Sequence, residues 1–453
     1  MFRIPSLKFC YRFLSQKIRP GFVTRRIDPR IMKLDTPEFH ELFTPELSKL
    51  SVLFKKSNYE LRIAGGAVRD LLMGIKPADV DFASTATPTE MKELFEREQI
   101  RMLHKRGEEH GTITCRIDDK ENFEITTLRV DIVCDGRRAE VEYTTDWQLD
   151  ANRRDLTINS LFLDLDGNVV DYFGGCEDVE KRRVAFVGDP EQRIQEDYLR
   201  ILRYFRFFGR ISGSSSHEDV NINAIKKHKD GLKGISPERI WTELKKIVVG
   251  RMAPEVMTSM LDTCELAPYL GLPSDYDLAR FTNVFSNYTK DVEPMTMVAS
   301  LCQKSEDVDS FHKRTKLSNL ERDLGKFVVS ERAEAEKNAA DFKWWTDKIV
   351  DLEVRPGPRI QRGKECVLQL AMSVGLRREL LDKLRGYELP VFPINGIVLK
   401  DAGVPPGPGM RAVLNYLYDV WKASEYQKTA EELLKSVDEA PKPPDSKKKK
   451  VNA

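Results

Sequence analysis

Two aspartates separated by one valine, Asp79 and Asp81, carry the clearest chemical signal in the sequence. They lead into a short apolar run, Val80 to Ala83, whose composition predicts a β-strand. Residues two apart on a strand point to the same side, so the two carboxylates are expected to stand together. Adjacent like charges are unfavourable unless a cation lies between them. Magnesium prefers such oxygen ligands together with substrate phosphates, so the pair predicts a Mg²⁺ site for phosphoryl transfer.

A glycine turn precedes this pair and strengthens the prediction. It begins at Gly65 and Gly66 and continues through Arg69, after a predicted strand and before a predicted helix. Glycines let the backbone approach a ligand closely, and a helix start offers N–H groups to phosphate. Arg69 would add a fork-shaped phosphate donor. A lone Asp-x-Asp is more often a solvated loop, whereas this combination indicates nucleotide chemistry. Glu124 is either a third carboxylate of the site or a half-exposed strand residue.

A second block, Arg153 to Ser160, places two arginines beside an acid and an amide. Guanidinium groups bind triphosphate well, and an acid or amide can bind ribose hydroxyls. The residues of interest are Arg154, Asp155 and Asn159. The acidic and glycine-rich stretch that follows, up to Gly175, is expected to form a hairpin.

The segment from Gln192 to Arg210 has apolar residues at helical spacing and predicts one continuous helix. Asp197 and Arg200 would be i, i+3 neighbours on it, with Arg203 on the same side and Arg206 farther round. An exposed ladder of ion pairs would contribute little to stability. A carboxylate, however, accepts from a base amino group, and a guanidinium donates to a ring nitrogen or carbonyl. Such a pair could read the pairing edge of a nucleotide in place of a template strand.

The composition is that of a globular protein and excludes several other classes. The net charge of +1 over 453 residues says nothing for or against RNA binding, which depends on local patches. Seven scattered cysteines with no Cys-x-x-Cys pair argue against a disulfide framework and against a zinc site. No apolar run is long enough to span a bilayer, so no membrane partner is expected.

Both ends of the chain are basic. The first 26 residues contain no acid, which predicts a mitochondrial transit peptide over residues 1–31, with a basic disordered arm as the alternative. Translation starting at Met32 would give a second form for the cytoplasm and nucleus. The lysine-rich end, residues 441–453, is expected to be a disordered basic C-terminus.

Taken in order, these blocks resemble the class II tRNA nucleotidyltransferases, the CCA-adding enzymes, in their eukaryotic mitochondrial form. The resemblance covers residues 61–244 and includes Ile235-Ser-Pro-Glu-Arg-Ile240, followed by Glu243. It implies an α+β fold, with a polymerase-β-like nucleotidyltransferase head of mixed sheet and helices before an elongated all-α neck, body and tail. The expected domains are the catalytic head at 32–188, the nucleotide-selecting neck at 189–262, the body at 263–350 and the tRNA-binding tail at 351–440.

The resemblance also implies an activity: template-independent addition of C, C and A to the tRNA 3′ end from CTP and ATP, with release of pyrophosphate. The tRNA would be contacted at its 3′ end and elbow. Asp79 and Asp81 would hold Mg²⁺, and Asp197 and Arg200 would select the base. The segment from Arg129 to Trp147 matches a mobile loop that helps the switch from CTP to ATP. The residues expected around the nucleotide are Gly66, Arg69, Arg154, Asp155, Asn159, Asp197, Arg200, Arg203 and Arg206.

Two other functions fit part of the pattern. A poly(A) polymerase of the same superfamily shares the head and the Asp-x-Asp pair, although the Glu196-Asp-x-x-Arg200 block favours a CCA-adding enzyme. A non-catalytic tRNA-binding protein is the alternative from another class. The intact Asp79 and Asp81 argue against it.

Overall fold

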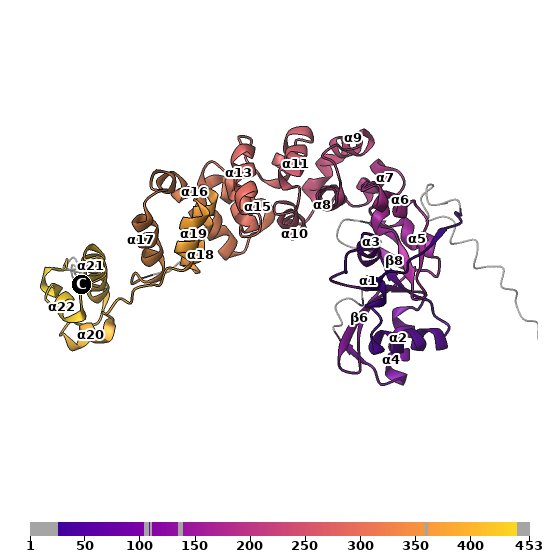
Figure 1. Ribbon diagram of the computed structural model, residues 1–453, viewed down its shortest axis with the longest axis horizontal. Helices are drawn as coiled ribbons and strands as arrows, with labels where there is room; N and C mark the ends of the chain where they lie inside the picture. The colour runs from indigo at the N-terminus through magenta and orange to yellow at the C-terminus, as the bar shows by residue number, and fades with distance from the viewer. Residues whose placement is uncertain (1–25, 104–107, 109–110, 135–138, 358–360, 442–453) are drawn as a thin grey trace, which may run out of the picture. The chain divides into compact units, whose positions relative to one another are not determined.

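The computed structural model describes residues 26–441 apart from 104–107, 109–110, 135–138 and 358–360. The chain divides into two units, Met1–Tyr269 and Leu270–Ala453. The strands of the described residues all lie in the first unit, coloured indigo to magenta in Figure 1. Residues 1–25 of the predicted transit peptide (1–31) and residues 442–453 of the predicted basic end (441–453) lie outside the described residues.

An eight-stranded mixed sheet forms the framework of the first unit, in the order β1-β10-β9-β2-β3-β6-β5-β4. β3 pairs in parallel with β6, and the other neighbours pair antiparallel. The strand predicted at 80–83 is confirmed as β3 with its ends shifted by one residue, the strand expected before the glycine turn is β2, and the predicted hairpin is formed by β9 and β10. The short edge strands β1 and β4 were not predicted. The strands are β1 Arg30–Lys33, β2 Leu61–Ala64, β3 Asp81–Ser84, β4 Arg101–Leu103, β5 Thr112–Ile117, β6 Glu121–Thr127, β9 Phe162–Asp164 and β10 Asn168–Asp171.

The segment matched to a mobile loop forms a two-stranded antiparallel ribbon. Its strands are β7, Arg129–Cys134, and β8, Ala139–Tyr143. It ends where α5, Trp147–Asn152, begins, with Asp146 as the N-cap of that helix. The ribbon thus starts and ends beside the arginine block at 153–160.

Helices pack on the sheet and complete the head. Helix α4, Pro88–Arg97, begins with a capping box formed by Thr87 and Glu90, and Pro88 occupies its first turn. Trp147 stacks edge-on against Phe162 in a core cluster at the base of the arginine block. The other head helices are α1 Pro37–His40, α2 Pro45–Lys56, α3 Gly66–Leu72 and α6 Gly175–Glu180, with the 3₁₀ turn η3 Thr157–Asn159.

The prediction of one helix from Gln192 to Arg210 is wrong. The chain forms α7, Pro190–Glu196, and α8, Arg200–Ile211, and Asp197 between them is extended, with φ −155°. The Asp197 carboxylate accepts the Leu199 N–H at 3.1 Å, a local side-chain bond that competes with helical hydrogen bonding. Asp197 and Arg200 are therefore not neighbours on one helical face.

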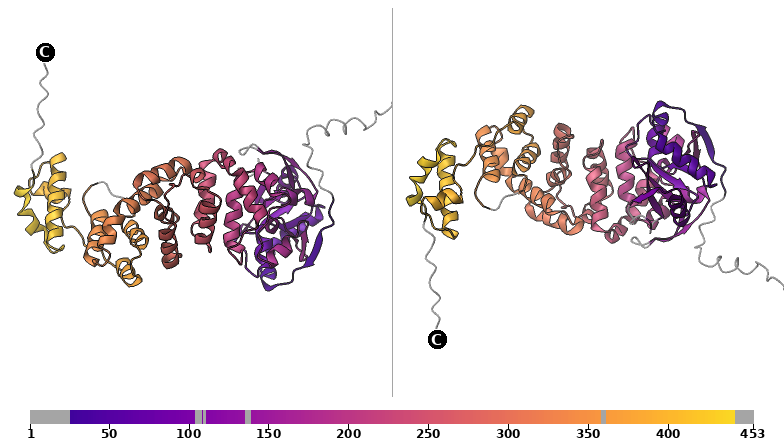
Figure 2. Two further views of the ribbon diagram at one scale, coloured as in Figure 1. Left: turned by 90° about the horizontal axis from the view of Figure 1, so that it is seen from above. Right: turned by 90° about the horizontal axis from the view of Figure 1, so that it is seen from below.

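The rest of the first unit and the described part of the second unit are helical, as Figure 2 also shows. An α+β head followed by helices is thus confirmed. In the first unit follow α9 Asp219–His228, η4 Lys229–Gly234, α10 Pro237–Ile247, α11 Ala253–Thr258, the π turn η5 Ser259–Thr263 and α12 Ala267–Leu270. The second unit contains α13 Leu278–Tyr288, α14 Pro294–Leu301, α15 Ser305–Thr315, α16 Asn319–Lys337, α17 Phe342–Glu353, α18 Gly363–Ser373, α19 Arg378–Arg385, α20 Gly396–Asp401, α21 Pro408–Ala423, α22 Ala430–Leu434 and η6 Val437–Glu439.

Buried side chains hold the last helices together. Leu417, Tyr418 and Trp421 of α21 pack with Ile394 and Leu399 in one apolar cluster. No helix of the described residues has the length and apolar character needed to cross a membrane. The five cysteines whose side chains the structure describes are buried and unpaired: Cys115, Cys176, Cys264, Cys302 and Cys366.

Candidate active site

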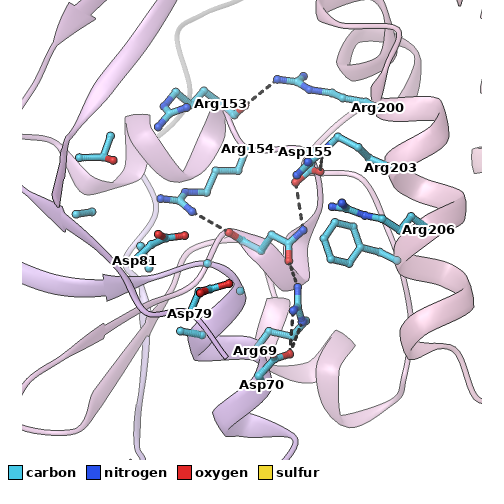
Figure 3. Close-up of a pocket in the computed structure, with 18 of the residues that line it drawn as sticks. Arg69, Asp70, Asp79, Asp81, Arg153, Arg154, Asp155, Arg200, Arg203 and Arg206 are labelled. Carbon is cyan, nitrogen blue, oxygen red and sulfur yellow. Dashed lines mark hydrogen bonds and ion pairs between the residues drawn. The ribbon is translucent and has the colours of Figure 1, made fainter. Parts of the chain in front are cut away.

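One cleft of about 1210 Å³ in the first unit brings the predicted site residues together. The glycine turn, the start of β3, the arginine block and α8 each contribute a wall (Figure 3). All eleven residues predicted from the sequence line it: Asp79, Asp81, Gly66, Arg69, Arg154, Asp155, Asn159, Asp197, Arg200, Arg203 and Arg206.

The acidic wall is formed where the chain enters β3. Asp81 is the first residue of that strand, and Asp79 lies in the bend before it; both are exposed to the cleft, while Val80 is half-buried. Glu124 of β6 is the register partner of Asp81 and lines the same cleft. Surrounding protein raises the pKa of Asp81, and the negative charge of Asp79 raises it further. This repulsion is what a bound cation would relieve.

These carboxylates suit a magnesium ion that takes its remaining ligands from elsewhere. Within the described ranges, no three His, Cys, Asp or Glu side chains form a ready-made metal cage. Mg²⁺ is usually held by one or two carboxylates, with water and substrate phosphates completing its shell. Asp79 and Asp81 match that donor set.

Gly65, rather than the predicted Gly66, fixes the shape of the glycine turn. Gly65 has φ +65°, and a Cβ there would lie 2.9 Å from Nη1 of Arg154. A Cβ on Gly66 would meet the Arg69 guanidinium at an ordinary 3.6 Å. The absence of a side chain at Gly65 therefore lets the arginine block approach α3.

Arg69 is buried in the wall of the cleft. Its Nε and Nη2 donate to Asp70 at 3.0 and 2.8 Å, and its Nη1 donates to Asn159 at 2.6 Å. Burial lowers the pKa of Arg69, although Asp70 opposes the effect. Arg210 of α8 also pairs with Asp70, at 2.8 Å. The guanidinium thus ties α3 to the arginine block, which leaves it less available to phosphate than the sequence suggested.

Asp150 organises the arginine block, and the sequence prediction missed it. Its buried carboxylate accepts from Arg153 at 2.9 Å, from Arg154 at 3.2 and 3.1 Å, and from the N–H of Arg129 at 3.2 Å. Burial favours the neutral acid, but the two arginines and the N–H together lower the pKa of Asp150. The i, i+3 and i, i+4 spacing to the arginines is the signal that would have identified it.

Asp155 joins the arginine block to α8. Its carboxylate accepts from Nε of Arg203 at 2.6 Å and from Asn159 at 3.3 Å (Figure 3). Burial opposes its ionisation, but the charge and hydrogen bond of Arg203 outweigh burial and lower the pKa of Asp155. The expected neighbours of triphosphate and ribose are therefore held in one ionic network.

The residues expected to read the base have other partners than predicted. Arg200 pairs with Glu196 and donates to the carbonyl oxygen of Arg153 at 2.8 Å. Asp197 instead accepts from Nη2 of Arg239, on α10, at 2.6 Å. Asp197 and Arg200 still line the same cleft although they are not paired with each other.

Glu243 and Phe207 complete this wall, and neither was predicted as a site residue. Glu243 of α10 is buried and pairs with Arg206 at 3.2 Å. Three guanidinium groups lie over the buried ring of Phe207: Arg69 at 5.0 Å, Arg203 at 5.7 Å and Arg206 at 4.4 Å. Contacts within the protein therefore orient Arg203 and Arg206 of α8.

Comparison with known protein families gives two matches along the first unit. Residues 61–185 match the model of the poly A polymerase head domain, and residues 220–270 match a model described as a probable RNA and SrmB-binding site of polymerase A. The head match spans the glycine turn, β3 and the arginine block.

Relatives match over most of the chain. It is 47% identical over 414 residues to the mitochondrial CCA tRNA nucleotidyltransferase 1 of Danio rerio, covering 90% of this chain and 94% of that protein. The Homo sapiens protein of the same name is 47% identical over 410 residues, with 89% and 92% covered. The fold is similar to that of a Bacillus stearothermophilus CCA-adding enzyme solved with CTP, at a TM-score of 0.69, 23% identity and coverage of 89% and 98%. The chain therefore belongs to the CCA tRNA nucleotidyltransferase family.

Proposed function

We propose that this chain adds C, C and A to the 3′ end of tRNA from CTP and ATP, with Asp79 and Asp81 as its metal-binding carboxylates. The observation that carries this assignment is that acidic side chains face a wall of ordered arginines within one cleft. The family to which the chain belongs supplies the reaction, and the paired charges of the cleft suit its substrates.

The reaction joins the terminal 3′ oxygen of the tRNA to the α-phosphorus of the nucleotide and releases pyrophosphate. Mg²⁺ held by Asp79 and Asp81 would lower the charge on the reacting phosphate and hold attacking and leaving oxygens. Arg154 lies beside the acidic wall, where its charge suits a triphosphate. Asp155 and Asn159 offer polar groups for the ribose, and Arg203 fixes the Asp155 carboxylate.

We assign the choice of base to Asp197 and Arg200, on a different wall of the cleft from Asp79 and Asp81. Asp197 accepts hydrogen bonds, Arg200 donates them, and both line the cleft without a nucleic-acid template. Residues 189–262 would then form the selecting neck. Residues 263–350 would form the body, and residues 351–440 a tail that binds the tRNA elbow by shape.

The activity is tested by incubating the full chain with tRNA that lacks the CCA end and with each nucleotide, and then analysing the extended tRNA. CTP with ATP should extend the tRNA by C, C and A and then stop. Long A tails without C would show a poly(A) polymerase. Binding of tRNA with no extension would show the non-catalytic alternative.

The metal assignment is tested by Asp79→Asn and Asp81→Asn. Each change removes one ionic ligand, so incorporation should fall by at least about a hundredfold while tRNA binding is unchanged. Glu96→Gln, on the exposed face of α4, is the matched control and should keep full activity. Undiminished turnover in either aspartate variant would refute the assignment.

We also propose that the protein works in mitochondria, as the names of the vertebrate relatives suggest. The acid-free start of the chain supports import. A second form beginning at Met32 would serve the cytoplasm and nucleus. Mapping N-termini in fractionated cells tests both statements, and finding no Met32 start would remove the second.

A further inference from the structure

Helix α10 touches Asp197, one of the two side chains that the proposed function assigns to base choice. Arg239 and Lys246 of this helix line the cleft, and Glu243 between them is buried and pairs with Arg206. Residues spaced i, i+4 and i+7 share one face of a helix. One face of α10 is therefore turned toward the selecting wall.

The closest of these contacts joins Arg239 to Asp197. Asp197 stands in the extended break between α7 and α8, so no regular helix orients its side chain. One carboxylate oxygen accepts the Leu199 N–H at 3.1 Å, and the other accepts from Arg239 at 2.6 Å. A carboxylate has about four lone-pair sites, so each oxygen can still accept from a ligand while it is held.

A second contact fixes the backbone next to Asp197. The ring of Tyr198 lies directly on Gly231 of η4, where a Cβ would be 2.1 Å from the ring. Gly234 in the same 3₁₀ segment has open space around its Cβ position. Neither glycine has positive φ, so an alanine would not strain the backbone at either position. The two positions therefore differ mainly in the space available for a side chain.

We infer that Arg239 is a positioning residue for base selection, which acts by aiming the Asp197 carboxylate, and that Gly231 assists by seating Tyr198. The inference rests on the proposed function. Cytosine and adenine carry an amino donor where uracil and guanine carry a carbonyl acceptor. A fixed carboxylate accepts from the amino group and repels the carbonyl, whereas a carboxylate that swings away no longer discriminates.

The direct test compares Arg239→Gln and Arg239→Lys in the full chain with CCA-lacking tRNA. The pair is 37% and 23% exposed, so its loss should cost little stability, and both variants should fold. Arg239→Gln should raise UTP and GTP incorporation relative to CTP and ATP by on the order of tenfold. Arg239→Lys keeps a single charged donor and should recover part of the selectivity. An unchanged ratio, or an equal loss for all four nucleotides, would overturn the inference.

A double-mutant cycle separates positioning from a general structural effect. If Arg239 acts through Asp197, then Arg239→Gln should change the ratio by less than roughly twofold once Asp197→Ala is present. Additive changes would show that Arg239 acts by another route. Affinity for tRNA should stay at the wild-type level in each variant.

Gly231→Ala and Gly234→Ala form a matched pair for the backbone contact. Gly231→Ala should loosen base choice because its methyl group displaces Tyr198, and Gly234→Ala should not. Equal ratios in the two variants would overturn the role of Gly231.

If the wild-type chain fails to add C, C and A, the proposed function itself is wrong. If it succeeds while Arg239→Gln stays selective, only the present inference fails.

Discussion

At the scale of single residues, the arginines of the cleft are held by neighbouring carboxylates. Asp150 holds Arg154, and Asp155 holds Arg203, in each case through a buried acid whose pKa is lowered by its partners. Groups already oriented before the substrate arrives need little rearrangement during the reaction. The ionic network therefore sets the geometry of the site at some expense of stability.

Substituting Gly65 tests how strongly activity depends on the position of the Arg154 guanidinium. Gly65→Ala would strain a residue with φ +65° and ψ −114°, a backbone conformation almost confined to glycine, by about 1–3 kcal/mol and would also push the Arg154 guanidinium. Gly74→Ala is the matched control, since Gly74 has φ +67° and open space around it. Both variants should lose stability in thermal melts, and Gly65→Ala should lose more because of the Arg154 contact. Only Gly65→Ala should lower kcat/KM for CTP, by on the order of a hundredfold; equal kinetics would show that Gly65 serves the turn alone.

His217 gives a pH-dependent prediction. Its ring stacks on Phe208 at 3.8 Å and bonds Tyr204 and Ser259, and burial lowers its pKa from 6.5 to about 4. Between these values the unfolded state binds more protons, so stability is complete above pH 6.5 and falls as pH drops toward 4. The loss is at most about 3 kcal/mol.

Urea unfolding at several pH values measures this loss. His217→Gln should flatten the slope between pH 6.5 and 4. A wild-type slope in His217→Gln would contradict the assignment.

At the scale of elements, the sequence predicted the strands that position the carboxylates, because alternating apolar runs and flanking Gly and Asp mark them clearly. It failed at the break between α7 and α8. The stretch around Asp197 contains no Gly or Pro, so the apolar periodicity runs on across it. At the break, the Asp197 carboxylate accepts the Leu199 N–H locally and also accepts from the distant Arg239. Arg200 donates to the carbonyl oxygen of Arg153, which is likewise distant in sequence. The two distant contacts depend on tertiary structure.

The edge strand β1 bears on the proposed start at Met32. Arg30 and Ile31 pair with Asp171 and Val170 of β10, and the N–H of Ile27 donates to Gln148 at 2.9 Å. A chain beginning at Met32 would keep only half of this strand.

Deleting residues 1–31 should therefore lower the free energy of unfolding by about 1–2 kcal/mol relative to deleting residues 1–25. Chemical denaturation of the two shortened chains measures the difference. Equal midpoints would show that β1 adds nothing to the stability of the head.

At the scale of the whole molecule, the nucleotide cleft is built entirely from residues of the first unit. The sequence predicted residues that the fold brings together in this cleft, because they fall in compact motifs. It could not predict which side chains of the second unit would contact tRNA under the proposed function, because recognition by shape leaves no short motif. The proposed division of nucleotide chemistry and tRNA binding between the two units can be tested by disrupting the second unit alone.

Leu417→Asp would place a charge in the fully buried cluster around α21 and melt that cluster. Affinity for tRNA should fall at least about tenfold, while CTP binding measured by calorimetry stays unchanged. Ile397→Asp, at a side chain that is 72% exposed, is the folding control and should resist limited proteolysis like the wild type. Weakened CTP binding in Leu417→Asp would contradict the separation.

The buried cysteines have a chemical consequence for an enzyme proposed to work near the respiratory chain. Burial raises the pKa of the Cys115 and Cys302 thiols to about 12. Peroxides attack the thiolate, so these sulfur atoms are protected both by lack of access and by their bound proton. Oxidative stress should therefore spare the folded enzyme at these positions and damage mainly molecules that have already opened.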